Sequence, residues 1–148
     1  MGETGRVTTD PRPPLAAALD LQPHPEGGWF RQTWAADEQA VLPDGRVRPT
    51  ATLIYFWLPA GECSAWHRVA SDETWLAHTG TVVLELGGDR ERPGPGRQVH
   101  VGTDADAGEV AQALVPAGQW QRTVPTDGAA LVSCLVSPGF DFADFELA

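Results

Sequence analysis

The sequence has no lysine. All ten of its basic residues are arginine, and they stand against twenty acidic residues, which gives a formal net charge of -10. A surface with this excess of negative charge repels the phosphate backbone of nucleic acids. The acidic residues are dispersed along the chain, as is typical of a solvated surface. We therefore expect no nucleic-acid partner.

Long apolar segments and disulfide-forming cysteine patterns are also missing. Cys63 and Cys134 are the only cysteines, and they form no Cys-x-x-Cys pair, so we expect two buried free thiols. No apolar stretch approaches the roughly 20 residues that a transmembrane helix needs. The proline-rich N-terminus lacks the apolar centre of a signal peptide. We expect a cytoplasmic protein with no membrane partner.

Turn-forming residues are plentiful, with 16 glycines and 13 prolines spread over 148 residues. This distribution argues against a helical bundle, and the length suits one domain. We divide the chain into a flexible tail over residues 1–12 and one domain over residues 13–148. A short helix is predicted from Pro13 to about Leu21, because proline is tolerated at a helix start.

From Trp29 onward, short runs of β-forming residues alternate with turns. The run 51–58 is continuously apolar and ends before a proline, which indicates a strand buried on both faces. Many short strands at close spacing predict an all-β sandwich or barrel. Strands are predicted at residues 29–34, 51–58, 66–69, 74–78, 81–86, 98–101, 113–115 and 129–136, with a loop at 89–97, an acidic turn at 102–108 and a last half-buried segment around 140–145.

The densest group of polar residues lies between Gly61 and Gly80 and contains His67 and Glu73. Side chains alternate along a strand, so His67 and Val69 point the same way, and a turn at 70–72 would bring Glu73 back to face His67. An imidazole and a carboxylate that meet in an apolar interior can bind a metal or form an acid–base pair. Burial of an unpaired carboxylate is costly, so Glu73 is expected to pair with His67, with Arg31 or with Arg68.

A second segment, Val115-Pro-Ala-Gly-Gln-Trp-Gln121, has a Pro-x-Gly turn followed at once by the start of a strand. Gln121 lies at the beginning of this strand, and its side-chain amide extends from it. The amide oxygen is predicted to serve either as a weak third metal ligand or as a hydrogen-bond acceptor for a substrate.

These two segments resemble the two sequence motifs of the cupins. Gly61, His67, Glu73 and Gly80 fit Gly-x5-His-x-His-x3-Glu-x6-Gly, while Pro116 and Gly118 fit Pro-x-Gly-x2-His. Further runs resemble cupin family five, small cupins whose biochemical function is largely undefined. These runs are 24–31, the surroundings of 54–56, 67–75, 115–120 and 136–145. The resemblance implies a single-domain cupin jelly roll, or double-stranded β-helix, that forms a homodimer.

Two positions depart from the cupin motifs, since Val69 and Gln121 replace two of the metal-binding histidines. Affinity for a divalent metal falls when such ligands are lost. We therefore expect either no cofactor or a weakly held divalent metal on His67, Glu73 and Gln121. Metal-free cupins include epimerases that use a pocket histidine as base. The resemblance thus implies proton transfer by an isomerase, epimerase or dehydratase, with His67 as base and Glu73 orienting it.

The substrate expected from this resemblance is a small molecule such as a sugar, a nucleotide-sugar or a biosynthetic intermediate. Two alternatives stay open: a non-catalytic cupin that binds sugars or nucleotides, and a weakly metal-dependent enzyme. Fold similarity alone does not choose between them, because cupins carry many unrelated activities.

Four further residues are candidates for the site. Tyr55, the only tyrosine, is either a general acid opposite His67 or a core residue. Arg31 is either a surface residue or a fork that grips an anionic group of the substrate. Trp75 is expected to line the pocket because it shares strand parity with Glu73, and His24 to lie at the pocket rim.

Overall fold

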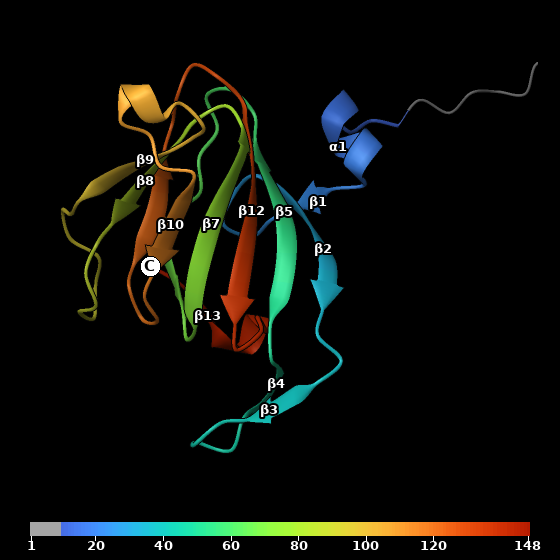
Figure 1. The fold of residues 1–148 in the computed structure, drawn as a ribbon, viewed down its shortest axis with the longest axis vertical. Coiled ribbons are helices and arrows are strands. Elements are labelled where there is room, and N and C mark those ends of the chain that lie inside the picture. The colour runs from blue at the N-terminus through green and yellow to red at the C-terminus, as the bar shows by residue number, and fades with distance from the viewer. Residues whose placement is uncertain (1–9) are drawn as a thin grey trace, which may run out of the picture.

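Strands are the main secondary structure in the computed structural model, which describes residues 10–148 (Figure 1). The all-β prediction is therefore confirmed. The elements are α1 (Pro14–Leu19), β1 (Gln22–Pro23), β2 (Trp29–Ala35), β3 (Gln39–Val41), β4 (Val47–Pro49), β5 (Thr52–Leu58), β6 (His67–Val69), β7 (Asp72–Thr79), β8 (Val82–Leu86), β9 (Gln98–Val101), η1 (Ala105–Ala107), β10 (Gln112–Val115), β11 (Gln121–Val124), β12 (Ala130–Ser137), η2 (Phe142–Asp144) and β13 (Phe145–Leu147).

Two antiparallel sheets form the body of the domain. The larger has the strand order β1-β2-β5-β12-β7-β10, and the smaller has the order β13-β6-β11-β8-β9. Phe56, Trp75 and Val132 of the larger sheet share one buried apolar cluster with Leu84 and Val101 of the smaller sheet. The two sheets therefore face each other across a common core, as a jelly roll requires.

Side-chain alternation decides which residues of the larger sheet face that core. On β7, Glu73 and Trp75 are buried and point inward, whereas Asp72 is exposed. On β5, Phe56 points inward and Tyr55 outward, since Tyr55 belongs to a second cluster on the other side of the sheet. A shift of register by one residue would exchange these two sets.

Helix α1 covers part of the outer face of the larger sheet. Ala16 and Leu21 are fully buried there against Trp57. This contact explains why the run 51–58 is apolar on both faces over part of its length. The helix is one residue shorter than predicted at its start and ends at Leu19, where Asp20 adopts a left-handed conformation and closes the last turn.

The hairpin of β3 and β4 extends beyond the sheets, close to η2 and β13 in Figure 1. Arg48 on β4 makes a two-pronged ion pair with Asp144 of η2, with N–O distances of 2.8 and 2.9 Å. A charge-assisted pair of this geometry fixes orientation. The hairpin therefore holds the C-terminal segment in place.

Most of the predicted strands agree with the structure to within two residues at each end. The hairpin strands β3 and β4 were not predicted; only the turn between them was. The acidic turn contains η1, and the last half-buried segment is η2 and β13. The predicted tail falls mainly on residues 1–9, outside the described residues, and stays a prediction. Among residues 10–148, no helix has the length and apolarity to cross a membrane.

Candidate functional site

His67 begins β6 and is almost completely buried between β11 and β13. Its Nδ1 lies 2.7 Å from the carbonyl oxygen of Ala65. A carbonyl oxygen only accepts hydrogen bonds, so Nδ1 carries a proton. The other ring nitrogen, Nε2, is thereby left to face the interior of the domain.

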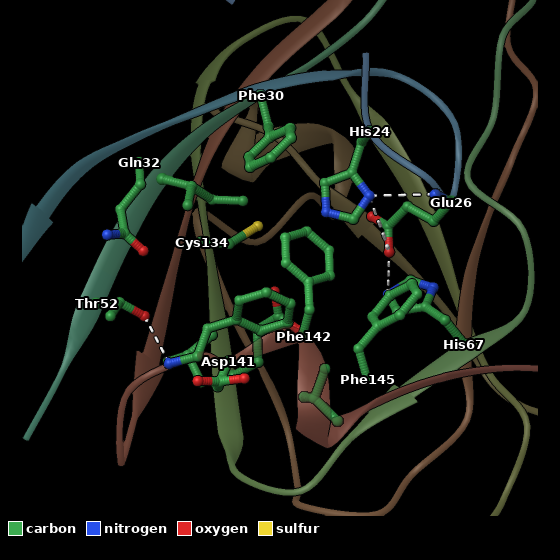
Figure 2. A pocket seen from close by; sticks show the side chains of 15 residues that line it. His24, Glu26, Phe30, Gln32, Thr52, His67, Cys134, Asp141, Phe142 and Phe145 are labelled. Atoms are coloured by element: carbon green, nitrogen blue, oxygen red, sulfur yellow. Dashed lines mark hydrogen bonds and ion pairs between the residues drawn. The ribbon is translucent and has the colours of Figure 1, made fainter. Parts of the chain in front are cut away.

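Glu26 is the partner of His67 Nε2, with its Oε2 at 2.7 Å (Figure 2). It lies in the turn between β1 and β2 and is 8% exposed. The backbone N–H of Ala65 donates to the carbonyl oxygen of Glu26 at 2.7 Å. Ala65 therefore positions both members of the pair, one through each of its backbone groups.

Glycine is required next to Glu26. Gly27 has φ of +107°, and a Cβ at this position would collide with the carbonyl oxygen of Cys63. Only glycine fits both the backbone conformation and this close approach. The Gly27-Gly28 turn is thus the local reason that Glu26 reaches the interior.

Glu73 is the second buried carboxyl group of the site. It lies on β7, and its Oε1 accepts a hydrogen bond from Gln121 Nε2 at 2.8 Å. Burial raises the pKa of Glu73 above its ordinary value, an effect reinforced by the charge of Glu26 and opposed by His67. Glu73 is therefore biased toward the protonated form, in which it is an acid.

The pKa of His67 is shifted by competing effects. Burial alone lowers it, but the charge and hydrogen bond of Glu26, the charge of Glu73 and the Ala65 carbonyl outweigh burial and raise it. The pKa of His24 is lowered, mainly by burial and also by His67, against the charge of Glu26. The two histidines are thus biased in opposite directions, His67 toward its charged form and His24 toward its neutral form.

His24 lies in the wall of the site rather than at its rim. Its Nδ1 accepts the backbone N–H of Glu26 at 3.1 Å, and its ring packs edge-on against Phe30 with centroids 4.5 Å apart. It therefore supports the Glu26 turn and also presents a ring surface to the interior.

These residues border a cavity of about 310 Å³. Figure 2 shows side chains that converge on this space from the β1–β2 turn, β6 and the C-terminal segment. The cavity is large enough for a small organic molecule. It is lined by His24, Glu26, Phe30, Gln32, Thr52, Ile54, His67, Val69, Glu73, Cys134, Val136, Phe140, Asp141, Phe142 and Phe145.

Two of the expected site residues lie behind the cavity instead of lining it. Trp75 Nε1 donates to Gln121 Oε1 at 2.9 Å, and Gln121 in turn donates to Glu73. Both side chains are essentially inaccessible. Trp75 and Gln121 therefore do not contact a substrate in this cavity, and their chain of hydrogen bonds fixes Glu73 from behind.

Tyr55 and Arg31 lie on the outer face of the larger sheet, opposite each other on β5 and β2. Arg31 Nη1 donates to the carbonyl oxygen of Leu19 at 2.9 Å, on the side covered by α1. Neither residue lines the cavity. The expectation that Tyr55 acts opposite His67, and that Arg31 grips the substrate, is wrong for this cavity because strand parity points both side chains away from it.

The expected metal ligands are not assembled. An indole N–H can only donate, so the Gln121 oxygen is occupied by Trp75, and the amide nitrogen is what faces Glu73. Val69 has no ligand atom. Within residues 10–148, no three His, Cys, Asp or Glu side chains are grouped so as to hold a metal ion. The set His67, Glu73 and Gln121 therefore does not fit the metal that the cupin motifs imply.

The free thiols also differ from expectation in one case. Cys134 is buried and lines the cavity, where burial, together with Glu73 and Glu26, raises its pKa well above the usual range. Cys63 is exposed. Cys134 is thus a neutral thiol in the cavity wall, and a poor nucleophile there.

Sequence reasoning did not assign a role to Glu26. The run that contains it was noted only as part of a resemblance, and no spacing rule connects a glutamate to a histidine 41 positions later. The one local signal is the Glu-Gly-Gly sequence, since paired glycines mark a turn that can approach another backbone closely.

Comparison with known proteins shows the family and the fold of the chain. A hypothetical protein from Leishmania major is 34% identical, with a TM-score of 0.81 over 90% of this chain and 84% of that chain. A protein from Shewanella oneidensis is 37% identical, with a TM-score of 0.79 over 90% and 82%. A cupin-2 domain from Rhodospirillum rubrum, 16% identical with a TM-score of 0.54 over 81% and 64%, shares the fold.

No curated protein matches the sequence significantly. The family model Cupin_5, described as cupin superfamily (DUF985), matches residues 14–148. The predicted double-stranded β-helix is confirmed by these neighbours. The chain therefore belongs to the Cupin_5 family of the cupin superfamily.

Proposed function

We propose that this cupin is an enzyme that moves a proton on a small organic substrate, as an isomerase, an epimerase or a dehydratase does. The observation that carries the proposal is the buried contact of 2.7 Å between His67 and Glu26 in the wall of a substrate-sized cavity. A structural ion pair has no need of a cavity. A pair that faces one can exchange a proton with a bound molecule.

The hydrogen bonds assign a role to each member of the pair. Because Nδ1 of His67 is fixed as a donor to Ala65, the next proton is shared between Nε2 and Glu26 Oε2. When Nε2 holds that proton, Glu26 is a carboxylate next to a positive charge and can accept a proton from substrate carbon. We therefore assign His67 and Glu26 to one proton-accepting unit.

Glu73 supplies the acid. Its raised pKa favours the protonated form, and its carboxyl group is held by the Gln121 amide at Oε1 and by a hydrogen bond with the Cys134 thiol in the cavity wall. In an isomerase or epimerase, Glu73 returns a proton to the substrate after the Glu26–His67 unit has removed one. In a dehydratase, it protonates the departing hydroxyl group, which leaves as water. Two groups biased toward opposite protonation states are the usual arrangement for such reactions.

The test is a search for exchange of carbon-bound hydrogen in deuterated water, with small metabolites incubated with the protein and followed by NMR. We expect at least one compound to exchange or to be converted by the native protein, and Glu26→Gln and His67→Gln to abolish this. Glu146→Gln, a change at an exposed position, is the control that keeps the rate unchanged. A compound that binds in the cavity without exchange, with an affinity that His67→Gln leaves unaltered, would contradict the proposal.

Non-catalytic binding of a small molecule is the second candidate function. It is favoured by the chain of hydrogen bonds from Trp75 through Gln121 to Glu73, which replaces a metal-binding position with a fixed, fully satisfied network. The same exchange experiment separates the two candidates, since a binding protein would retain its ligand unchanged.

A further inference from the structure

The wall of the cavity contains acidic side chains, and no arginine lines it among residues 10–148. Glu26, Glu73 and Asp141 are among its lining residues. Glu73 is biased toward its neutral form, so an anionic molecule such as a phosphate ester or a carboxylate would meet groups of its own charge in Glu26 and Asp141.

The histidines do not reverse this balance. His67 is already paired with Glu26 through Nε2 and with the Ala65 carbonyl through Nδ1, so it has no free donor for an anion. His24 accepts a hydrogen bond at Nδ1, and its burial favours the uncharged ring. Neither ring offers an uncompensated positive charge to the cavity.

Two arginines that hold the C-terminal segment of the cavity wall are engaged by carboxylates. Arg48 holds Asp144 with two hydrogen bonds, and Arg46 pairs with Asp144 at 3.1 Å and with Asp44 at 2.6 Å. Neither arginine lines the cavity. An anion at the mouth would have to displace these carboxylates to gain a partner.

Aromatic rings make up much of the remaining wall. Four of the five phenylalanines in the sequence line the cavity: Phe30, Phe140, Phe142 and Phe145. Phe142 packs against Phe140 at 4.9 Å, against Phe145 at 5.8 Å and against Phe30 at 6.3 Å, each with steep interplanar angles. Figure 2 shows the rings of Phe30, Phe142 and Phe145 converging on the cavity from different elements. The faces of such rings carry partial negative charge and attract cations.

We propose that the cavity takes a small organic cation, with an ammonium-type nitrogen on an apolar body. Glu26 and Asp141 supply negative charge, the phenylalanine rings supply a surface on which a weakly hydrated cation can rest, and the cavity volume admits a molecule of this size. This inference names the substrate class of the proposed enzyme and rests on that proposed function. It makes nucleotide-sugars, which carry phosphate groups, unfavourable ligands.

The experiment compares three molecules of nearly the same shape: choline, its neutral analogue 3,3-dimethylbutan-1-ol, and the anionic 3,3-dimethylbutanoate. Their binding to the native protein is measured by NMR titration of the ring signals of His24 and His67, which report directly on the cavity. We expect choline to bind at least about ten-fold more tightly than the neutral alcohol, as a desolvated cation–π contact predicts, and the anion not to shift the signals.

Two substitutions at the mouth sharpen the test, because Asp141 and Phe142 are both exposed there. Phe142→Leu keeps the apolar surface but removes the ring, so choline is expected to lose about ten-fold in affinity while the neutral alcohol is little changed. Asp141→Asn is expected to weaken choline alone. Asp106→Asn, in the exposed turn of η1, is the matched control and leaves all three affinities unchanged. Equal binding of the alcohol, preferential binding of the anion, or failure of all three to shift the histidine signals would overturn the inference.

His67→Gln separates this inference from the proposed function. The substitution removes a positive charge next to Glu26, so choline binding is expected to be retained or strengthened, whereas proton transfer is lost. Choline binding without any exchange reaction would support the cation site and contradict the proposed enzymatic function. Exchange on a neutral or anionic substrate would support the proposed enzymatic function and contradict the cation site.

Discussion

The interior of the domain and the outer face of its larger sheet each place a histidine against an oxygen. Inside, His67 Nε2 lies 2.7 Å from Glu26; outside, His78 Nε2 lies 2.6 Å from Ser133 Oγ, with the Tyr55 ring 6.1 Å away. The distances are nearly the same. The surroundings differ, because His67 is enclosed beside a cavity and His78 is exposed.

This comparison shows that a short contact becomes a candidate site only where the protein also excludes water. In the interior, burial and neighbouring charge move the pKa values of Glu73 and His67 away from their ordinary values. On the outer face, His78 is exposed, so solvent can compete for the same hydrogen bond, and neither His78 nor Ser133 lines the cavity described above. The interior pair is therefore the candidate site, and the His78–Ser133 contact on the outer face is its control.

The largest effect is expected when the interior pair of Glu26 and His67 is removed. Glu26→Gln or His67→Gln is expected to lower the turnover of the exchange substrate by about 10²- to 10⁴-fold, the usual contribution of a positioned acid–base group. His78→Gln, on the outer face, is expected to leave turnover unchanged. Steady-state rates of the three variants measure this, and a large loss in His78→Gln would show that the wrong face had been assigned.

A second test compares tryptophans inside and outside. Trp75→Ala empties a fully buried position and is expected to lower the free energy of unfolding by about 3–5 kcal/mol. Trp34→Ala, half-exposed on β2, is expected to change it by less than about 0.5 kcal/mol. Urea unfolding followed by circular dichroism gives both values. Equal losses would mean that Trp34 is covered in solution.

Gln121→Leu tests the chain of hydrogen bonds behind the cavity. The change leaves the Trp75 N–H and one oxygen of Glu73 without partners, so we expect a loss of about 1–3 kcal/mol in unfolding free energy. Gln112→Leu, at an exposed position of β10, is the control with the same change of side chain. A neutral result at Gln121 would indicate that water replaces the lost partners.

The smallest expected effect is in the pH dependence of stability. Burial raises the pKa of Glu73 in the folded state, so the protonated form is favoured there. The stability that this protonated form contributes is lost as the pH rises from the pKa of the unfolded state through that of the folded state. Glu73→Gln keeps an acceptor for Gln121 but cannot ionise. The native protein is therefore expected to lose stability relative to Glu73→Gln as the pH rises above about 4.5, the unfolded value.

Unfolding measured in urea from pH 5 to pH 9 gives this difference directly. The raised pKa of His67 acts in the same direction in both proteins, since its contribution is present below the unfolded pKa and is lost as pH rises through the folded one. It does not cancel completely, because the charge of Glu73 is one of the causes that raise the pKa of His67, so the same comparison is repeated in a His67→Gln background. A difference that stays constant over this range would show that Glu73 ionises normally.

The fold was predictable because its signals are local. The apolar run 51–58, the alternation around Glu73 and the Pro-x-Gly turn at Pro116 each have the period or punctuation of a strand and its turn. The hairpin of β3 and β4 was not predicted, since its strands are short, contain no buried residue and owe their position to Arg48 and its contact with Asp144.

The site was only partly predictable, because its partners are distant in sequence. Parity correctly placed Glu73 toward the interior, and the same argument, applied across β2 and β5 with the structure in view, places Arg31 and Tyr55 on the other face. Sequence alternation alone does not tell which set of β5 side chains faces the core; the pairing of β5 with its neighbours decides this. Glu26 was missed because its contact with His67 depends on a turn that packs against another loop.

The two backbone hydrogen bonds of Ala65 limit how related sequences can vary around this position. It aligns the proton-accepting pair through its backbone N–H and C=O, so its side chain is free to change without moving either partner. An insertion or deletion between Ala65 and His67 would instead turn the imidazole to the opposite side of the strand. Substitutions at position 65 should therefore be tolerated in evolution, whereas changes in loop length here should be rejected.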